Sequence, residues 1–266
     1  MYHSISSAAG ARFRQFTVSP ASFAEQMAFL HRQRYTPLTV TQYIQARSQG
    51  ASALVERPVI LTFDDGFADF FTDALPVLRQ YNLTATLYIT TAFVGGVSSW
   101  MRREKETARR MLNWQQVREI AAHGIECAAH THTHPQLDTL SLRAARNEMA
   151  RSKSLLEDHL GQAVRSFAYP YGYYTVRLRH AAREIGFTSA CAVRHAKSSI
   201  AEDAFRLARL MVGADTDLTT FAALLADTQY ALLAARSLYL RARTPAWQLV
   251  RRGSASMIRY FQGGIK

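Results

Sequence analysis

The 266-residue chain contains little cysteine and no long apolar run. Its two cysteines, Cys127 and Cys191, lie in apolar stretches, which indicates buried free thiols and excludes a disulfide scaffold or a zinc site of the Cys-x-x-Cys type. No apolar run approaches the roughly 20 residues that a membrane-spanning helix needs. The first residues show no basic segment followed by an apolar one, so we expect no secretory leader and a cytoplasmic location.

Acidic side chains are absent from the end of the chain. Ala231–Lys266 holds six arginines, one lysine and no acid, so it carries more than half of the net charge of +12. Apolar residues such as Leu233 and Trp247 are interspersed among these cations, a pattern typical of a basic amphipathic helix. We therefore expect residues 228–266 to form a helical basic tail that either packs on the main domain or contacts the inner face of a membrane. No motif indicates nucleic-acid binding, and we expect no such partner.

The rest of the chain alternates between strand-like and helix-like patterns. Apolar β-type runs cover Val59–Phe63, Ala85–Thr90, Gly124–Ala129, Arg165–Tyr169, Thr188–Val193 and Ala208–Val212, with shorter candidates at Tyr2–Ile5 and Tyr35–Leu38. Helix-like stretches cover Ser22–Gln33, Thr41–Ser48, Phe70–Tyr81, Trp114–His123, Leu142–Leu160, Val176–Ile185 and Leu218–Asp227. Such alternation predicts parallel strands joined by helices. We expect an α/β fold, an irregular (β/α) barrel of about seven parallel strands over residues 1–227, with a doubly wound open sheet as the alternative.

Three polar strings begin where predicted strands end. They are Asp64-Asp65, His130 with the residues after it, and Tyr169–Gly172. In parallel α/β folds, ligands bind at the carboxyl ends of the strands. The three strings are therefore expected to meet on one face of the protein.

Asp64 and Asp65 place two carboxylates side by side. Neighbouring residues of a loop point in different directions, so one carboxylate can bind a metal while the other faces a water molecule. A dication between two such carboxylates would relieve their mutual repulsion. A simple turn that caps the following helix would use the same residues.

The string His130-Thr131-His132-Thr133-His134 places three imidazoles within five residues. A helical turn would bring His130 and His134 to one face, whereas an extended strand would pair His130 with His132. Pro135 and the threonines indicate that the strand has ended, which favours His130 and His134. Two histidines and one aspartate suit catalytic Zn²⁺, and they also suit the Fe(II) site of non-haem oxygenases. An exposed polar loop without a metal would be the plainest alternative.

Taken together, these strings resemble a known family. The order and spacing of Thr62–Gly66 (TFDDG), His130–Pro135 (HTHTHP) and Tyr169–Gly172 (YPYG) are similar to those of polysaccharide deacetylases of the NodB-homology group. The resemblance runs from Tyr2 to about Val212. It implies a distorted β/α barrel that uses a divalent metal, Zn²⁺ being the expected ion, to remove N-acetyl groups. The substrate would be an N-acetylglucosamine-type glycan or a lipid-linked sugar.

The resemblance also implies roles for single residues. Asp65, His130 and His134 would bind the metal, and Asp64 would act as the general base. The main-chain N–H near Tyr171 would help to hold the oxyanion of the tetrahedral intermediate.

Two departures from the commonest family pattern point to a rearranged branch. No histidine follows His195, so the usual acid near the end of the domain is missing. The string Tyr2-His3-Ser4-Ile5 resembles one in poly-N-acetylglucosamine deacetylases, which makes His3 the expected general acid. Ala168 occupies the position of an arginine that steadies the catalytic aspartate, and Arg209 is the expected replacement.

Three further residues are expected to contact the substrate. Pro170 and Tyr171 belong to the third string, and Trp100 could stack on a sugar ring from a loop that follows a strand. The cations of Gly95–Arg110 could meet a phosphate group, or form an exposed charged surface without a role. A glycan-binding protein that has lost catalysis is the second functional hypothesis, because the usual acid near the end of the domain is missing and Ala168 departs from the pattern. An Fe(II) oxygenase is the third.

Overall fold

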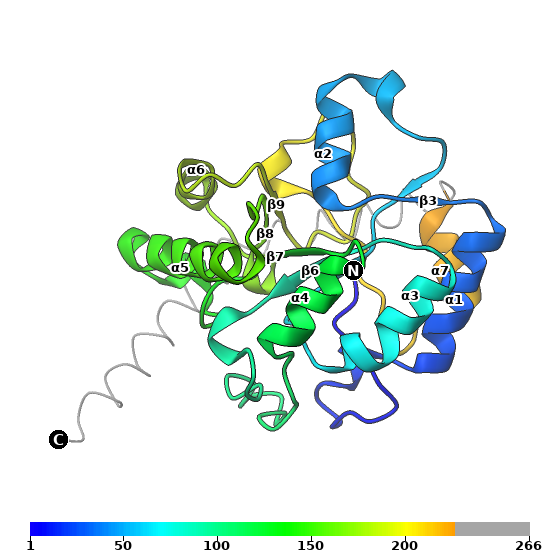
Figure 1. Cartoon of the computed structure of the whole chain (residues 1–266), viewed down its shortest axis with the longest axis horizontal. Coiled ribbons are helices and arrows are strands. Elements are labelled where there is room, and N and C mark those ends of the chain that lie inside the picture. Colours follow the sequence, from blue (N-terminus) through cyan, green and yellow to red (C-terminus); the bar gives the residue numbers. More distant parts are fainter. Residues whose placement is uncertain (227–266) are drawn as a thin grey trace.

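The computed structural model describes residues 1–226, and its centre is a five-stranded parallel sheet (Figure 1). The strands β5 (Thr62–Phe63), β6 (Thr86–Ile89), β7 (Glu126–Ala129), β8 (Ser166–Ala168) and β9 (Ser189–Cys191) follow one another in chain order. They are short and almost entirely buried, as expected for parallel strands covered on both faces. Because each crossover returns the chain to the same end of the sheet, all carboxyl ends of the strands lie together.

Two extended segments join the outer strands and complete an irregular barrel. Tyr2 pairs in parallel with Phe63 of β5, and Leu207 pairs in parallel with Cys191 of β9. Between these segments, the Met1 amine donates to the Leu210 carbonyl at 2.8 Å and Val212 N–H donates to the Met1 carbonyl at 2.9 Å. The barrel prediction is therefore confirmed, and the open sheet is not the fold.

The predicted strand Ala208–Val212 is wrong as a regular strand. The Ala208 N–H donates to Ser198 Oγ at 2.7 Å, which removes it from the ladder. Arg209 turns its side chain to the barrel interior and is bound there by Asp64. The segment therefore carries the buried side chain of Arg209 and forms hydrogen bonds with its neighbours only at separate points.

The predicted strand Val59–Phe63 is split into two. β4 (Pro58–Val59) pairs in parallel with β3 (Thr36–Pro37), and only Thr62–Phe63 joins the main sheet. A further parallel pair links β1 (Ser4–Ile5) to β2 (Thr17–Val18). These small pairs attach the first third of the chain to the barrel.

The helices lie close to their predicted positions. They are α1 (Pro20–Arg32), α2 (Val40–Ser48), α3 (Leu75–Gln80), α4 (Trp114–Ala122), α5 (Leu142–Leu160), α6 (Val176–Glu184) and α7 (Leu218–Leu225). A π-helical turn, Phe70–Ala74, precedes α3, and single 3₁₀ turns occur at Arg14–Phe16, Ala51–Ala53, Thr91–Phe93, Leu137–Thr139, Pro170–Gly172 and Ala204–Arg206. Polar side chains cap most helix starts: Ser19, Thr39, Asn113, Ser141, Thr175 and Asp217 each accept a main-chain N–H of the first turn. Gly161, with φ of 66°, ends α5 as expected.

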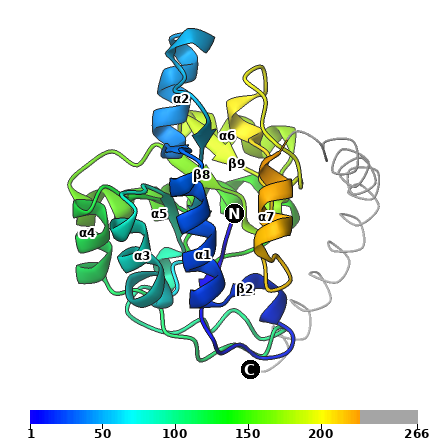
Figure 2. The same ribbon diagram turned by 90° about the vertical axis from the view of Figure 1, so that its right-hand side faces the viewer.

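The two ends of the barrel differ: α2 packs at one end, and the polar strings lie at the other. α2 begins beside the amino end of β6, where Val40 N–H donates to Thr86 Oγ1 at 2.9 Å, and it projects away from the barrel at the top of Figure 2. Val40 and Tyr43 of α2 pack inside the barrel against Tyr88. α1 and α7 lie side by side on the outside, with Phe29 and Phe221 in edge contact at 6.2 Å (Figure 2). The carboxyl ends of the strands therefore remain available for a site.

Two further expectations concern membranes and the tail. Over residues 1–226, no helix combines the length and apolarity required to cross a bilayer. The predicted tail at 228–266 lies outside the described residues, and so does the domain boundary before it.

Candidate metal centre and its surroundings

Asp65, His130 and His134 meet at the carboxyl end of the barrel. Asp65 Oδ1 lies 3.6 Å from His130 Nε2 and 3.2 Å from His134 Nε2, and one donor atom from each residue falls within 4.8 Å of the other two. All three residues are buried. The structure thus brings together the three residues that the sequence singled out as metal ligands.

Left-handed backbone turns place these side chains. Asp65 (φ 79°) and Gly66 (φ 84°) turn the chain directly after β5, and Thr131 (φ 66°) and His134 (φ 58°) do so after β7. Such conformations are costly for residues other than glycine and persist only where other contacts hold them. They are typical of functional sites.

The histidine loop is held by side-chain hydrogen bonds. His134 N–H donates to Thr131 Oγ1 at 3.0 Å. Glu148 of α5 accepts the N–H groups of His132 at 3.0 Å and Thr133 at 2.7 Å, and it also accepts the Thr133 hydroxyl. The His132 ring points elsewhere, with its Nδ1 3.0 Å from Thr91 Oγ1. The pairing of His130 with His134, rather than with His132, is the one that the structure brings together.

The donor set fits a single divalent metal ion. Donors at roughly 2.0–2.1 Å from a tetrahedral ion are about 3.3 Å from one another, which is close to the two separations of 3.2 and 3.6 Å between Asp65 and the histidines. His130 Nδ1 is 2.8 Å from the Ala168 carbonyl, a contact that makes Nδ1 the donor and leaves Nε2 free as a ligand. Burial lowers the pKa of His130 to about 4, so its ring is neutral at neutral pH, as a ligand must be. His134 Nδ1 is buried without a hydrogen-bond partner among residues 1–226.

Asp64 lies beside this group and is bound by Arg209. Arg209 donates to both carboxylate oxygens, at 2.6 and 2.8 Å, and its Nε donates to the Ala192 carbonyl at 3.2 Å. The ring of Tyr88 lies 5.4 Å from the guanidinium carbon. Burial alone would raise the pKa of Asp64. The charge of Arg209, the nearby rings of His130 and His3 and the hydrogen bonds from Arg209 together outweigh burial and hold that pKa well below its usual range. The guanidinium that is missing at Ala168 thus reaches the aspartate from another segment.

His3 lines the same cavity. It lies between the Tyr2 pairing with β5 and strand β1, and its ring packs 5.1 Å from that of Phe16. Its Nδ1 is buried without a hydrogen-bond partner in the described part of the chain. Burial lowers the pKa of His3, although the charges of Asp65 and Asp64 oppose this shift.

The cavity has a volume of about 240 Å³ and a largely aromatic wall. The ring centroid of His134 lies 5.4 Å from that of Trp100 and 4.8 Å from that of Tyr171. The side chain of Tyr171 is exposed, and its φ of 59° turns the chain at the rim. The lining residues are Met1, His3, Phe13, Phe16, Asp64, Asp65, Trp100, Met101, Glu104, His130, His134, Tyr171, Tyr173, Val193 and Met211.

One expectation about this wall is wrong. Pro170 does not line the cavity, because it is buried as the first residue of the 3₁₀ turn that presents Tyr171. For the cations of Gly95–Arg110, the alternatives were a phosphate contact and an exposed charged surface. Arg102, Arg103 and Arg110 are exposed, which favours the second alternative, and Arg109 is held by Asp69 and Glu106.

Several residues of the site carry no sequence signal. Glu148 lies on the exposed side of a helical pattern, and Phe13 and Phe16 precede the first predicted helix without any motif. Glu104 contributes a carboxylate to the rim.

A second hollow, of about 300 Å³, lies on the other side of Arg209 and is lined mainly by apolar residues, so it lacks the donors of a metal site. The fold and the site define a (β/α)-barrel protein with three buried donors suited to one divalent metal.

Comparisons with known proteins identify the family. A family model described as polysaccharide deacetylase matches residues 52–190, which is more than half of the chain. YxkH of Bacillus subtilis, assigned to the polysaccharide deacetylases, is 30% identical over 223 residues, covering 84% of this chain and 74% of that protein. The poly-beta-1,6-N-acetyl-D-glucosamine N-deacetylase of Escherichia coli is 31% identical over 122 residues, covering 44% of this chain and 18% of that protein. The chain belongs to the polysaccharide deacetylase family, as its motifs predicted.

Solved structures show the same fold. The Streptococcus pyogenes deacetylase PplD in complex with acetate has a TM-score of 0.74 at 24% identity, covering 85% of this chain and 96% of that one. IcaB from Ammonifex degensii has a TM-score of 0.69 at 23% identity, covering 85% of this chain and 95% of that one. The barrel described above is therefore the deacetylase fold of this family.

Proposed function

We propose that this protein is a metal-dependent hydrolase that removes N-acetyl groups from an N-acetylglucosamine-type glycan or lipid-linked sugar. The observation that carries the proposal is the meeting, in one cavity, of the donors Asp65, His130 and His134, the ionised Asp64 and the buried imidazole of His3. Relatives named poly-beta-1,6-N-acetyl-D-glucosamine N-deacetylase and chitooligosaccharide deacetylase support this substrate class.

The residues divide the work of amide hydrolysis. Asp65, His130 and His134 hold the metal, for which Zn²⁺ fits the donor set. When bound, that ion supplies Lewis acidity for the acetyl carbonyl and for water. Asp64 accepts the proton of the attacking water, and Arg209 keeps its carboxylate ionised and oriented.

Proton donation completes the reaction. The bond between the acetyl carbon and nitrogen breaks as His3, in its protonated form, gives its proton to the nitrogen, so that acetate and a free amine are released. The proton that Asp64 took from water replaces the one that His3 gave, which restores both groups. The main-chain N–H near Tyr171 stabilises the oxyanion, and Trp100 and Tyr171 hold the sugar. The cavity of about 240 Å³ has the size for one sugar ring and its acetyl group.

An acetate-release assay tests the proposal. We expect the full chain, loaded with Zn²⁺, to release acetate from N-acetylglucosamine oligomers or lipid-linked sugars. A chelator or Asp64→Asn should abolish the release. Sugar binding without any acetate release, in the zinc-loaded wild-type protein, would instead identify a glycan-binding protein that has lost catalysis. A requirement for oxygen and Fe(II) would overturn both readings.

A further inference from the structure

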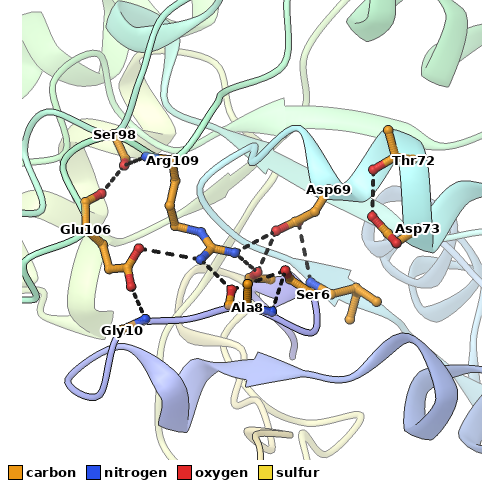
Figure 3. A network of polar contacts seen from close by, with 11 residues as sticks. Ser6, Ala8, Gly10, Asp69, Thr72, Asp73, Ser98, Glu106 and Arg109 are labelled. Atoms are coloured by element: carbon orange, nitrogen blue, oxygen red, sulfur yellow. Dashed lines mark hydrogen bonds and ion pairs between the residues drawn. The ribbon is translucent and has the colours of Figure 1, made fainter.

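Arg109 occupies the centre of a polar network beside the cavity (Figure 3). Its Nη2 donates to Ser4 Oγ at 2.6 Å and to Asp69 Oδ2 at 3.0 Å, and its Nη1 donates to the Ala8 carbonyl at 3.1 Å. Asp69 in turn accepts the Ser4 hydroxyl at 2.5 Å and the Ile5 N–H at 3.4 Å. Ser4 directly follows His3, so the network binds the segment that carries the proposed acid.

The same network reaches the loop that carries Trp100. Glu106 Oε2 lies 3.5 Å from Arg109 Nη1, and the other carboxylate oxygen accepts the Gly10 N–H (Figure 3). A Cβ at Gly10 would lie 2.5 Å from that oxygen, so this contact requires glycine unless Glu106 moves. Ser98 Oγ accepts the Arg109 N–H at 3.1 Å and donates to the Glu106 carbonyl, which closes the loop on itself.

Aromatic rings flank the guanidinium. Its central carbon lies 5.2 Å from the Phe13 ring centroid and 5.5 Å from that of Phe67, both within cation–π distance. Phe67 stacks in parallel with Trp100 at 6.3 Å. With Met101 and Met111, Phe13 and Phe67 form a small apolar cluster separate from the main core. Phe13 and Met101 of this cluster also line the cavity, so the cluster forms part of its wall.

We propose that Arg109 is a positioning residue that joins the segment carrying His3 to the loop carrying Trp100, and so sets the geometry of the acid and of the sugar-binding wall. The proposal rests on the proposed function, in which these two residues contact the substrate. The metal ligands come from the turns after β5 and β7 and are not bonded to this network. Loss of Arg109 should therefore disturb substrate binding and proton donation while metal affinity is preserved.

Burial makes the network sensitive to a single change. The side chains of Arg109, Asp69 and Glu106 are only 12%, 14% and 12% exposed. Removal of the guanidinium would leave the partly buried carboxylates of Asp69 and Glu106 without their counter-charge, and it would remove the bonds from Arg109 to Ser4 and to the Ala8 carbonyl that join the two segments. The neighbouring Arg110 is exposed, so it offers a control with the same change of charge in the same loop.

The test compares Arg109→Gln, Arg109→Lys and Arg110→Gln in the full zinc-loaded chain. For Arg109→Gln we expect kcat/KM to fall by about tenfold to a hundredfold, a loss typical of a displaced active-site group. The zinc Kd should stay within about twofold of wild type. Arg109→Lys should recover part of the loss, and Arg110→Gln should match wild type. Amide hydrogen exchange should become faster in peptides covering residues 4–16 and 98–109, but not in residues 126–134.

Two results would overturn the proposal. The first is that Arg109→Gln has the same kcat/KM and the same rates of amide hydrogen exchange as Arg110→Gln. In that case the network does not position His3 or Trp100. Faster exchange throughout the barrel together with weaker zinc binding would show a general structural role. If the wild-type protein releases no acetate from any glycan, the proposed function fails, whereas the exchange and zinc measurements still decide whether Arg109 holds these two segments.

Discussion

Arg209 binds both carboxylate oxygens of Asp64 from a position 145 residues further along the chain. This paired geometry fixes the carboxylate in the plane of the guanidinium and restricts how it can face the cavity. Arg209 is itself oriented by the Ala192 carbonyl and by the ring of Tyr88. The base of the proposed reaction is therefore positioned by the segment that closes the barrel.

The first prediction concerns this pair. Arg209→Gln should raise the pKa of Asp64, because burial then acts without the opposing charge, and should leave the carboxylate misplaced. We expect kcat to fall by about 10²–10⁴-fold, the usual contribution of a positioned general base. The measurement is the pH profile of acetate release, in which the limb that requires an ionised base should move to higher pH. Asp158→Asn, at an exposed position of α5, serves as the control, and an unshifted profile would contradict the prediction.

The second prediction separates the histidines. His134→Gln should abolish binding of Zn²⁺, whereas His132→Gln should retain it, because only the first ring faces Asp65. Zinc stabilises the folded state by an amount that grows with its concentration above the Kd. Thermal unfolding with and without zinc should therefore show a Tm increase for wild type and His132→Gln alone. An equal loss in both variants would assign the metal to different ligands.

The architecture was predictable from the sequence where local patterns dominate. Alternating strand and helix patterns indicated the parallel barrel, because connections between parallel strands need helices. The exact strands were less predictable. Ala208–Val212 has the apolar composition of a strand, yet the Ala208 N–H is taken by Ser198 and the ladder breaks there. A hydrogen-bond partner supplied by tertiary contacts leaves no trace in a local pattern.

The site was predictable only as far as it consists of motifs. The turns after two strands carry Asp65, His130 and His134 in recognisable strings, and the barrel topology brings those turns together. Glu148 and Arg109 act on main-chain and side-chain groups far away in the sequence, Arg109 reaching Ser4 across 105 positions. The residues next to Glu148 and Arg109 in the sequence form no recognisable motif. Only the folded structure therefore shows what these two side chains contact.

The third prediction concerns the aromatic wall. Trp100→Ala should raise KM for an N-acetylglucosamine oligomer by about tenfold, because the stacking surface for the sugar is lost. Zinc affinity should be unchanged, since the indole lies against the His134 ring without being a ligand. Trp114→Ala removes an indole that stacks on His159, at 3.8 Å, outside the cavity, and should leave KM unchanged. Equal KM values for both variants would exclude Trp100 from sugar binding.

The fourth prediction follows from the composition of Ala231–Lys266. Its seven cations and interspersed apolar residues should bind vesicles that contain anionic lipid. Deletion of residues 228–266 should abolish sedimentation with such vesicles, and added salt should weaken the binding of the full chain. Neutral vesicles provide the control. Undiminished sedimentation of the shortened protein would place membrane contact elsewhere or exclude it.

The last prediction links the buried histidines to stability. Burial lowers the pKa of folded His130 from 6.5 to about 4, and it also lowers that of His3. The unfolded chain therefore takes up these protons at a higher pH than the folded protein does. Stability that is fully present above about pH 6.5 is consequently lost as the pH falls toward 4. The Asp64 and Asp65 carboxylates, whose pKa values are lowered from 3.8, add a similar loss only at lower pH.

Denaturant unfolding of the metal-free protein measures this effect. We expect the free energy of unfolding to fall by about 3 kcal/mol between pH 6.5 and 4 on account of His130, since one pKa unit corresponds to about 1.4 kcal/mol. His130→Gln should flatten this slope, while His123→Gln, at an exposed position, should keep it. Zinc should steepen the slope, because the metal binds only the neutral rings and competes with protons for them. A slope that is the same in His130→Gln and wild type would mean that the acid sensitivity of the fold arises outside the metal centre.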